Sequence, residues 1–276
     1  VTPEGYTLRV GTSRFLSQEF FLLYKFGLAV YFLYWAILWR WVNDYYTGPF
    51  MTHWTWYITT TYFILSSLSA FLYWRATKTA GAPTLRSPAH GGHAVASAAP
   101  GPFPNGKVTR PPLPTALERL QRILWSVACV GSLIVCAIFW GALYGGEDLT
   151  TVDVHAHAVI AIIMLVDQIL VADEFKLRYV MYAQAFGTAY LVFNVCWYYL
   201  APKDDRLIYE IIDWNNNPLV ACIYGLGSLL VLAPLFAWLH FGMFRLRERL
   251  YERLLPMETA TALEPPVIEL KYPVDV

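Results

Sequence analysis

Six long apolar runs decide what this chain can fold into. They cover residues 20–39, 54–74, 123–144, 154–172, 179–200 and 218–244. Each run is about 19 to 27 residues long, and a helix needs about 20 residues to cross the hydrocarbon core of a bilayer. Because backbone amides cannot stay unpaired in lipid, runs of this length form helices that satisfy their own hydrogen bonds. The sequence therefore predicts an all-α integral membrane protein with six transmembrane helices.

The composition agrees with a membrane protein. Hydrophobic residues make up 57% of the chain and charged residues 14%, which is about half the charged fraction of a soluble domain. The formal net charge is zero, so we expect no nucleic-acid partner. The first apolar run is too long for a signal peptide, and no small-residue cleavage site follows it. The four cysteines lie inside predicted spans without the spacing of a metal site.

The segments between the apolar runs alternate in charge. Segment 75–122 carries seven basic residues and one acid, and four arginines open the C-terminal tail. Segment 145–153 instead carries three acids and no base. Basic residues near spans favour the cytoplasmic side. We therefore predict that both termini and the long second loop are cytoplasmic.

This topology divides the chain into five parts. They are an N-terminal cytoplasmic segment (1–17), spans one and two (18–75), a cytoplasmic loop (76–116), spans three to six (117–245) and a cytoplasmic tail (246–276). The loop is rich in Pro, Gly, Ala and Ser and has no hydrophobic period. Such a composition predicts a disordered linker.

A few charged residues remain inside the predicted spans. A charge at mid-span costs roughly 2.5–3.5 kcal/mol, so each one is a candidate functional residue. Lys25 lies five residues into span one, where its long side chain can snorkel to the headgroups. Asp167 lies more than halfway along span four and needs a partner inside the bundle, either in a structural hydrogen bond or in a site.

Several polar residues share one predicted membrane depth. Span two begins with Thr52 and His53, and span four begins with Asp153, His155 and His157. Both helices start at the non-cytoplasmic face. His155 and His157 are about 200° apart around the helix, so one alone can face a given pocket. Asp153 is four residues before His157, and its carboxylate can fix the tautomer of that imidazole.

A hydroxyl beside a histidine is the minimum for nucleophilic acyl transfer. The histidine takes the proton as the oxygen attacks and later returns it to the leaving alcohol. Thr52 is the hydroxyl in the cluster, and its alternative role is a helix cap or a bond to a backbone carbonyl four residues back. Candidate oxyanion donors are Asn43, His53 and Asn194.

Several segments resemble one known family. They are 49–55, 137–140, 190–197, 208–214 and the ten-residue spacing from His157 to Asp167. Together they resemble the family that contains rolling stone of insects and the androgen-induced membrane hydrolases of vertebrates. In the hydrolase branch, a threonine and a histidine form the catalytic pair that cleaves fatty acid esters of hydroxy fatty acids. Thr52 and His157 match that pair, so the resemblance implies an intramembrane lipid esterase whose substrate enters from the bilayer.

Two other functions stay open. Segment 208–214 looks closer to the rolling stone branch, which is associated with myoblast fusion, so a non-enzymatic role in cell fusion or scaffolding is the first alternative. The second is a metal or haem protein using His53, His155 and His157, but among the histidines of the predicted spans only His240 lies toward the cytoplasmic face. We expect no cofactor and no metal, and a location in the endoplasmic reticulum or the plasma membrane.

Overall fold

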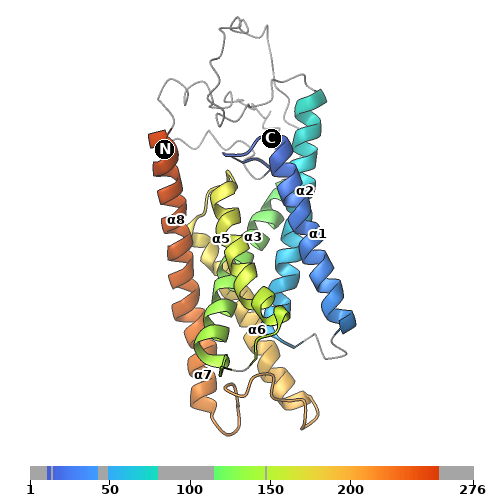
Figure 1. Ribbon diagram of the computed structural model, residues 1–276. Helices are drawn as coiled ribbons and strands as arrows, with labels where there is room; N and C mark the ends of the chain where they lie inside the picture. The colour runs from blue at the N-terminus through green and yellow to red at the C-terminus, as the bar shows by residue number, and fades with distance from the viewer. Residues whose placement is uncertain (1–10, 14, 43–48, 80–114, 147, 255–276) are drawn as a thin grey trace, which may run out of the picture.

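The structure, a computed structural model, describes residues 11–13, 15–42, 49–79, 115–146 and 148–254 (Figure 1). Most of the predicted cytoplasmic loop, the end of the predicted tail and the candidate Asn43 lie outside these ranges. Within them the chain is helical apart from connecting turns and loops, and β-type pairing is limited to an isolated bridge between Ser13 and Val171. The predicted all-α class is confirmed for the part of the chain that is described.

The described residues form six helical rods (Figure 1). The first three are α1 (Gln18–Val42), α2 (Met51–Thr79), and α3 (Thr115–Ile138) with the π-helical turn η1 (Phe139–Leu143). The fourth joins α4 (Thr151–Val154), the π turn η2 (His155–Val159) and α5 (Ile160–Leu170). The last two are the 3₁₀ turn η3 (Leu177–Tyr179) with α6 (Val180–Leu200), and α7 (Pro218–Gly227) with the π turn η4 (Ser228–Leu232) and α8 (Ala233–Leu254).

Four of the rods are long and apolar enough to cross a membrane. They are Gln18–Leu38, Ala116–Leu143, Thr151–Leu170 and Pro218–Tyr251. Only 11% of the apolar window of the last rod is buried inside the bundle, so its outer face requires lipid rather than water around it. The chain is therefore a membrane protein with four candidate spanning helices by length and composition.

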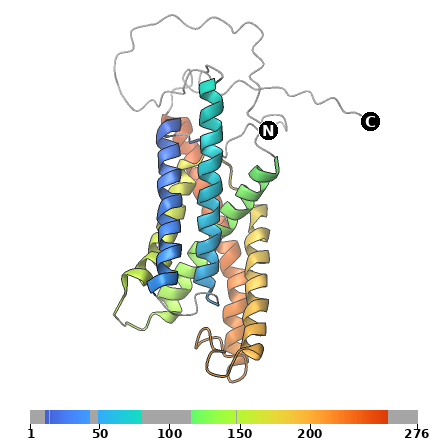
Figure 2. The same ribbon diagram turned by 90° about the vertical axis from the view of Figure 1, so that its right-hand side faces the viewer.

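Helix α2 is more polar than these four because it carries a run of threonines. Their hydroxyls bond backbone carbonyls one turn back: Thr59 to Thr55, Thr60 to Trp56 and Thr61 to Tyr57, each at 2.8 Å. Such bonds let a threonine-rich helix satisfy its polar groups without water. The helix lies along α1, as the view in Figure 2 shows.

An ion pair lies inside the bundle. Lys25 of α1 and Asp167 of α5 are both fully buried, and the Nζ to Oδ1 distance is 2.5 Å. The same carboxylate accepts bonds from the hydroxyls of Tyr24 at 3.2 Å and Tyr62 at 2.6 Å. The partner expected for Asp167 is present, but the snorkelling predicted for Lys25 is wrong. Lys25 turns inward because an acid on a neighbouring helix lies at its own depth.

The two ends of the bundle carry different connections. The start of α1 and the end of α8 lie at one end, with the α5–α6 connection (Figure 1). The start of α2, the α3–α4 connection and the loop 201–217 between α6 and α7 lie at the other end (Figures 1 and 2). The candidate site lies toward this second end, where α2 and α4 both begin.

Candidate functional site

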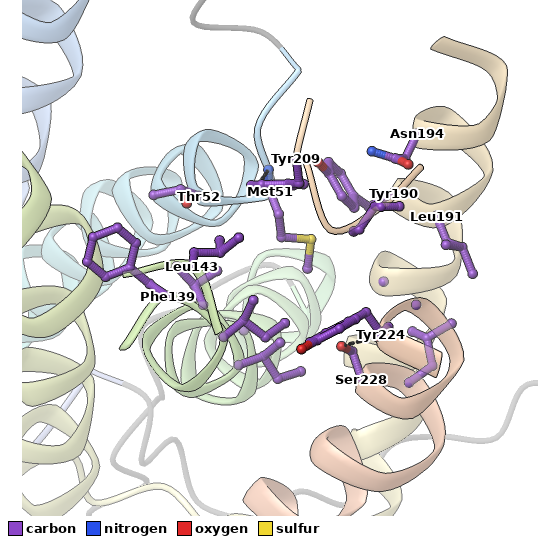
Figure 3. A pocket seen from close by; sticks show the side chains of 18 of the residues that line it. Met51, Thr52, Phe139, Leu143, Tyr190, Leu191, Asn194, Tyr209, Tyr224 and Ser228 are labelled. Atoms are coloured by element: carbon purple, nitrogen blue, oxygen red, sulfur yellow. Dashed lines mark hydrogen bonds between the residues drawn. The ribbon is translucent and has the colours of Figure 1, made fainter. Parts of the chain in front are cut away.

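A cavity opens between α2, α3, α6 and α7 (Figure 3). It holds about 870 Å³ of empty space, counting the part open to the outside. Its polar lining residues are Thr52, His157, Tyr190, Asn194, Tyr209, Tyr224 and Ser228. The other described lining residues are hydrophobic or glycine, and none is charged. The cavity therefore suits a largely apolar ligand with one polar end.

Thr52 and His157 meet at the wall of this cavity. The Thr52 Oγ1 atom lies 3.2 Å from Nε2 of His157. The other ring nitrogen, Nδ1, lies 2.8 Å from the backbone carbonyl oxygen of Asp153. A carbonyl oxygen can only accept, so Nδ1 carries the proton and Nε2 presents its lone pair. The Thr52 hydroxyl thus donates to a histidine in the tautomer that a general base needs.

The His157 ring also stacks against an aromatic side chain. Phe139, the first residue of η1, stacks on His157 with ring centroids 3.6 Å apart and planes inclined by 5°. His157 itself lies in η2. The cavity lining also includes Ser228 and Leu229 of η4. All three π turns of the described chain thus contribute to the cavity, and π turns are often found at functional sites.

Asp153 orients His157 through its backbone rather than its carboxylate. Its Oδ2 atom instead accepts the Thr150 amide at 3.1 Å and the Thr150 hydroxyl at 2.6 Å, and the Thr150 Oγ1 atom accepts the Asp153 amide at 3.2 Å. This is a capping box that begins α4. The carboxylate contact expected from the sequence is not formed, because the carboxylate turns toward Thr150, three residues earlier in the chain.

The nucleophile candidate occupies the first turn of α2. Thr52 is the second residue of the helix, where unpaired amides and the helix dipole create partial positive charge. The hydroxyl bonds to His157, unlike the three threonines further along α2 that bond back to carbonyls. Developing negative charge on Thr52 is favoured at this position.

Tyr209 is a site residue that the sequence analysis missed. It comes from the loop 201–217, and its hydroxyl accepts the Met51 amide at 3.0 Å (Figure 3). Burial raises its pKa above the ordinary value. Ile208 is buried, and Ile211 and Ile212 line the cavity. The sequence pattern that could have predicted this inward fold is the presence of three isoleucines around one tyrosine within a loop.

Asp213 fastens this loop to α6. Its carboxylate accepts the Tyr198 hydroxyl at 2.9 Å, the amides of Asn215 and Asn216 at 3.0 and 2.9 Å, and the Asn216 side chain at 2.7 Å. These bonds, led by those from Asn216, lower the pKa of Asp213 to about 2. A carboxylate that accepts several bonds favours its charged form. The anchor keeps Tyr209 over the start of α2.

The other site residues predicted from the sequence, Asn194, His53 and Asp167, have contacts of their own. Asn194 lines the cavity, but its Oδ1 atom accepts the Trp214 indole at 2.8 Å. His53 is partly buried against Phe50, with ring centroids 5.6 Å apart, and does not line the cavity. Asp167 belongs to the ion pair with Lys25, away from the cavity lining.

The three histidines of the metal alternative do not converge. His155 bonds to the Tyr31 hydroxyl and packs on Trp35, with ring centroids 4.3 Å apart, whereas His157 faces Thr52. The two therefore face different sides, as their spacing predicts. Among the described residues, no three His, Cys, Asp or Glu side chains are grouped to hold a metal ion. His240 is buried rather than interfacial and contacts Gln168.

Comparison with known proteins gives one match. A family model described as "Protein rolling stone" matches residues 116–261. The matched region runs from α3 to beyond α8 and includes His157 and Tyr209, but not Thr52. No curated protein and no solved structure matches the chain.

Proposed function

Because the chain belongs to the rolling stone family, we propose that it uses the Thr52–His157 pair as the nucleophile and base of an intramembrane lipid esterase. The main observation that supports this proposal is the 3.2 Å contact between Thr52 Oγ1 and the unprotonated Nε2 of His157 at the wall of an apolar cavity. The hydroxyl, base and binding space that acyl transfer needs are therefore together.

The reaction proceeds in two steps. Thr52 attacks the ester carbonyl while His157 accepts its proton, and the tetrahedral oxyanion collapses to acyl-threonine as the alcohol leaves with that proton. A water molecule then attacks the acyl carbon, His157 again takes the proton, and the fatty acid is released as Thr52 recovers its hydrogen. The carbonyl oxygen of Asp153 holds the imidazole in one tautomer throughout.

The substrate class follows from the cavity lining. An apolar cavity with no charged lining residue accepts an acyl chain and excludes an unpaired carboxylate, whose desolvation is costly. We propose a fatty acid ester, such as an ester of a hydroxy fatty acid, that binds with its acyl chain inside and any charged end outside. The ester reaches the cavity from the bilayer.

The proposed topology has six spans with both termini in the cytoplasm, in the endoplasmic reticulum or plasma membrane. Helices α2 and α6 run beside the four candidate spans, and the start of α1 and the end of α8 lie at the same end (Figure 1). Lys203→Cys in the loop 201–217 and Ser97→Cys in the predicted cytoplasmic loop, each in a cysteine-free chain, should react with impermeant maleimide from opposite sides. Reaction from one side contradicts the topology.

Fluorophosphonate labelling tests the activity. The detergent-solubilised wild type should be labelled, and both Thr52→Ala and His157→Ala should lose labelling while remaining folded by thermal melting. Thr61→Ala is the matched control, since Thr61 is an exposed threonine of the same helix that bonds only to the Tyr57 carbonyl. A folded wild type that stays unlabelled, or a Thr52→Ala variant labelled like wild type, overturns the esterase.

A non-enzymatic role in cell fusion or scaffolding is the second candidate. One observation favours it: the family match at residues 116–261 does not include the helix that carries Thr52. Under this role, the variant Thr52→Ala keeps full activity in a cell-fusion assay. Loss of fusion in that variant, with normal amounts of protein in the membrane, contradicts it.

A further inference from the structure

A hydroxyl from the loop between α6 and α7 lies in the same cavity as the Thr52–His157 pair. We propose that Tyr209 donates the hydrogen bond that stabilises the oxyanion formed when Thr52 attacks an ester. This inference rests on the proposed esterase function. It assigns Tyr209 a direct role in catalysis, so the loop 201–217 contributes a residue to the catalytic site.

The hydrogen-bond pattern leaves the Tyr209 proton available. The Tyr209 oxygen accepts the Met51 amide at 3.0 Å, and a phenol has one proton left to donate. The hydroxyls of Thr52 and Tyr190 are its neighbours. The Tyr190 hydroxyl donates its own proton to the Pro49 carbonyl at 2.8 Å. No hydrogen bond among the described residues uses the Tyr209 proton, which can therefore turn to an oxyanion that forms beside Thr52.

The position of Tyr209 strengthens it as a donor. The Met51 amide belongs to the first turn of α2, where the helix end carries partial positive charge. A hydroxyl whose oxygen accepts a bond becomes a better donor through its hydrogen. Burial raises the pKa of Tyr209, which keeps the phenol protonated at neutral pH. A fixed, neutral donor beside the attacking atom is the arrangement that stabilises a tetrahedral intermediate.

Two other polar groups of the cavity already have hydrogen-bond partners of their own. Ser228 donates its proton to the Tyr224 carbonyl at 2.5 Å, and the Asn194 oxygen holds the Trp214 indole. Figure 3 shows Tyr209 beside Met51, with Tyr224 and Ser228 across the cavity. Tyr209 is thus the lining residue whose hydroxyl contacts the residue next to Thr52 in the chain.

The substitution Tyr209→Phe removes the hydroxyl and keeps the ring. Removing one oxyanion donor lowers kcat by about 10²–10³-fold. Using p-nitrophenyl decanoate in detergent micelles, we expect a fall of that size in kcat with little change in KM. The pH profile should not change, because His157 remains the base. Fluorophosphonate should still label Thr52 fully, but more slowly.

Controls separate this inference from the proposed function. Tyr57→Phe removes a hydroxyl from an exposed tyrosine of α2 and should leave kcat unchanged. If Thr52→Ala is inactive while a folded Tyr209→Phe hydrolyses the ester like wild type, the role of Tyr209 is overturned and the esterase stands. If Tyr209→Phe raises KM and lowers the melting temperature but not kcat, Tyr209 has a structural role and the inference again fails. A wild type that neither hydrolyses nor labels overturns both.

Discussion

The carbonyl oxygen of Asp153 lies 2.8 Å from Nδ1 of His157, one helical turn further along the chain. A backbone oxygen is present whatever side chain occupies position 153. The tautomer of His157 therefore does not depend on the Asp153 carboxylate, which is used in the capping box with Thr150. The pair needs no acid of the kind that orients the histidine of a catalytic triad.

The substitution Asp153→Asn tests this arrangement. In hydrolases whose acid fixes the histidine tautomer, its loss lowers kcat by about 10⁴-fold. Here we expect the fluorophosphonate labelling rate to stay within about threefold of wild type, because the carbonyl contact persists. The weakened cap should lower the free energy of unfolding by no more than about 2 kcal/mol. A fall in labelling comparable to that of His157→Ala would show that the carboxylate acts on the imidazole.

The Lys25–Asp167 pair predicts a strong coupling between two helices. Lys25→Met leaves the Asp167 carboxylate buried without its cation, and breaking a buried pair in this way costs about 3–5 kcal/mol. The double variant Lys25→Met/Asp167→Asn should recover much of that loss, because no charge stays buried. The free energy of unfolding from SDS titration of the single and double variants measures the coupling. Additive losses would contradict the pairing.

Much of the helical frame was predictable from the sequence, because apolar run length follows directly from bilayer thickness. The six runs coincide with the six helical rods, and the family resemblance is confirmed by the match at 116–261. The approach of Thr52 to His157 was also expected, since two helices that start at one face place their first turns at one depth. It is a contact in the structure, and its catalytic use stays a prediction.

Other features depend on packing that no local pattern reveals. Tyr209 reaches the start of α2 at Met51 because the loop 201–217 folds inward, and the length of an apolar run does not indicate where a loop goes. The pairing of Lys25 with Asp167 depends on which helices pack together, and neither apolar run reveals that by itself. The π turn at His155–Val159 could not be predicted from the sequence either. The packing of the surrounding helices, rather than a local residue pattern, decides where a helix forms such a turn.

The anchor of the Tyr209 loop predicts a pH dependence at the acid extreme. The pKa of Asp213 is lowered to about 2 from its ordinary value of 3.8 by hydrogen bonds to its charged form. Its stabilising contribution is therefore complete above pH 4 and is lost as the pH falls toward 2. Amide hydrogen exchange in 201–217 should stay constant from pH 8 to 4, after correction for the intrinsic rate, and increase below that. Asp213→Asn should increase exchange at all pH values, and increased protection would contradict the anchor.

The depth of the cavity sets the acyl chain length that an esterase of this kind accepts. A Cβ atom added at Gly187 would lie 2.4 Å from Cδ2 of Leu229. The substitution Gly187→Ala therefore forces the Leu229 side chain to move, and the adjacent empty space is the cavity. Leu229 lines that cavity and is mostly buried. Leu229→Ala should enlarge the cavity by the volume that this side chain occupies.

The two substitutions should therefore shift chain-length preference in opposite directions. Each methylene that no longer fits loses about 0.8 kcal/mol of burial, which is about a fourfold fall in kcat/KM. Across p-nitrophenyl esters of four to sixteen carbons, Gly187→Ala should favour shorter chains and Leu229→Ala longer ones. Gly242→Ala is the control, because a Cβ atom there meets nothing within 4 Å. If all three variants kept the chain-length preference of the wild type, the acyl chain would have to bind outside this cavity.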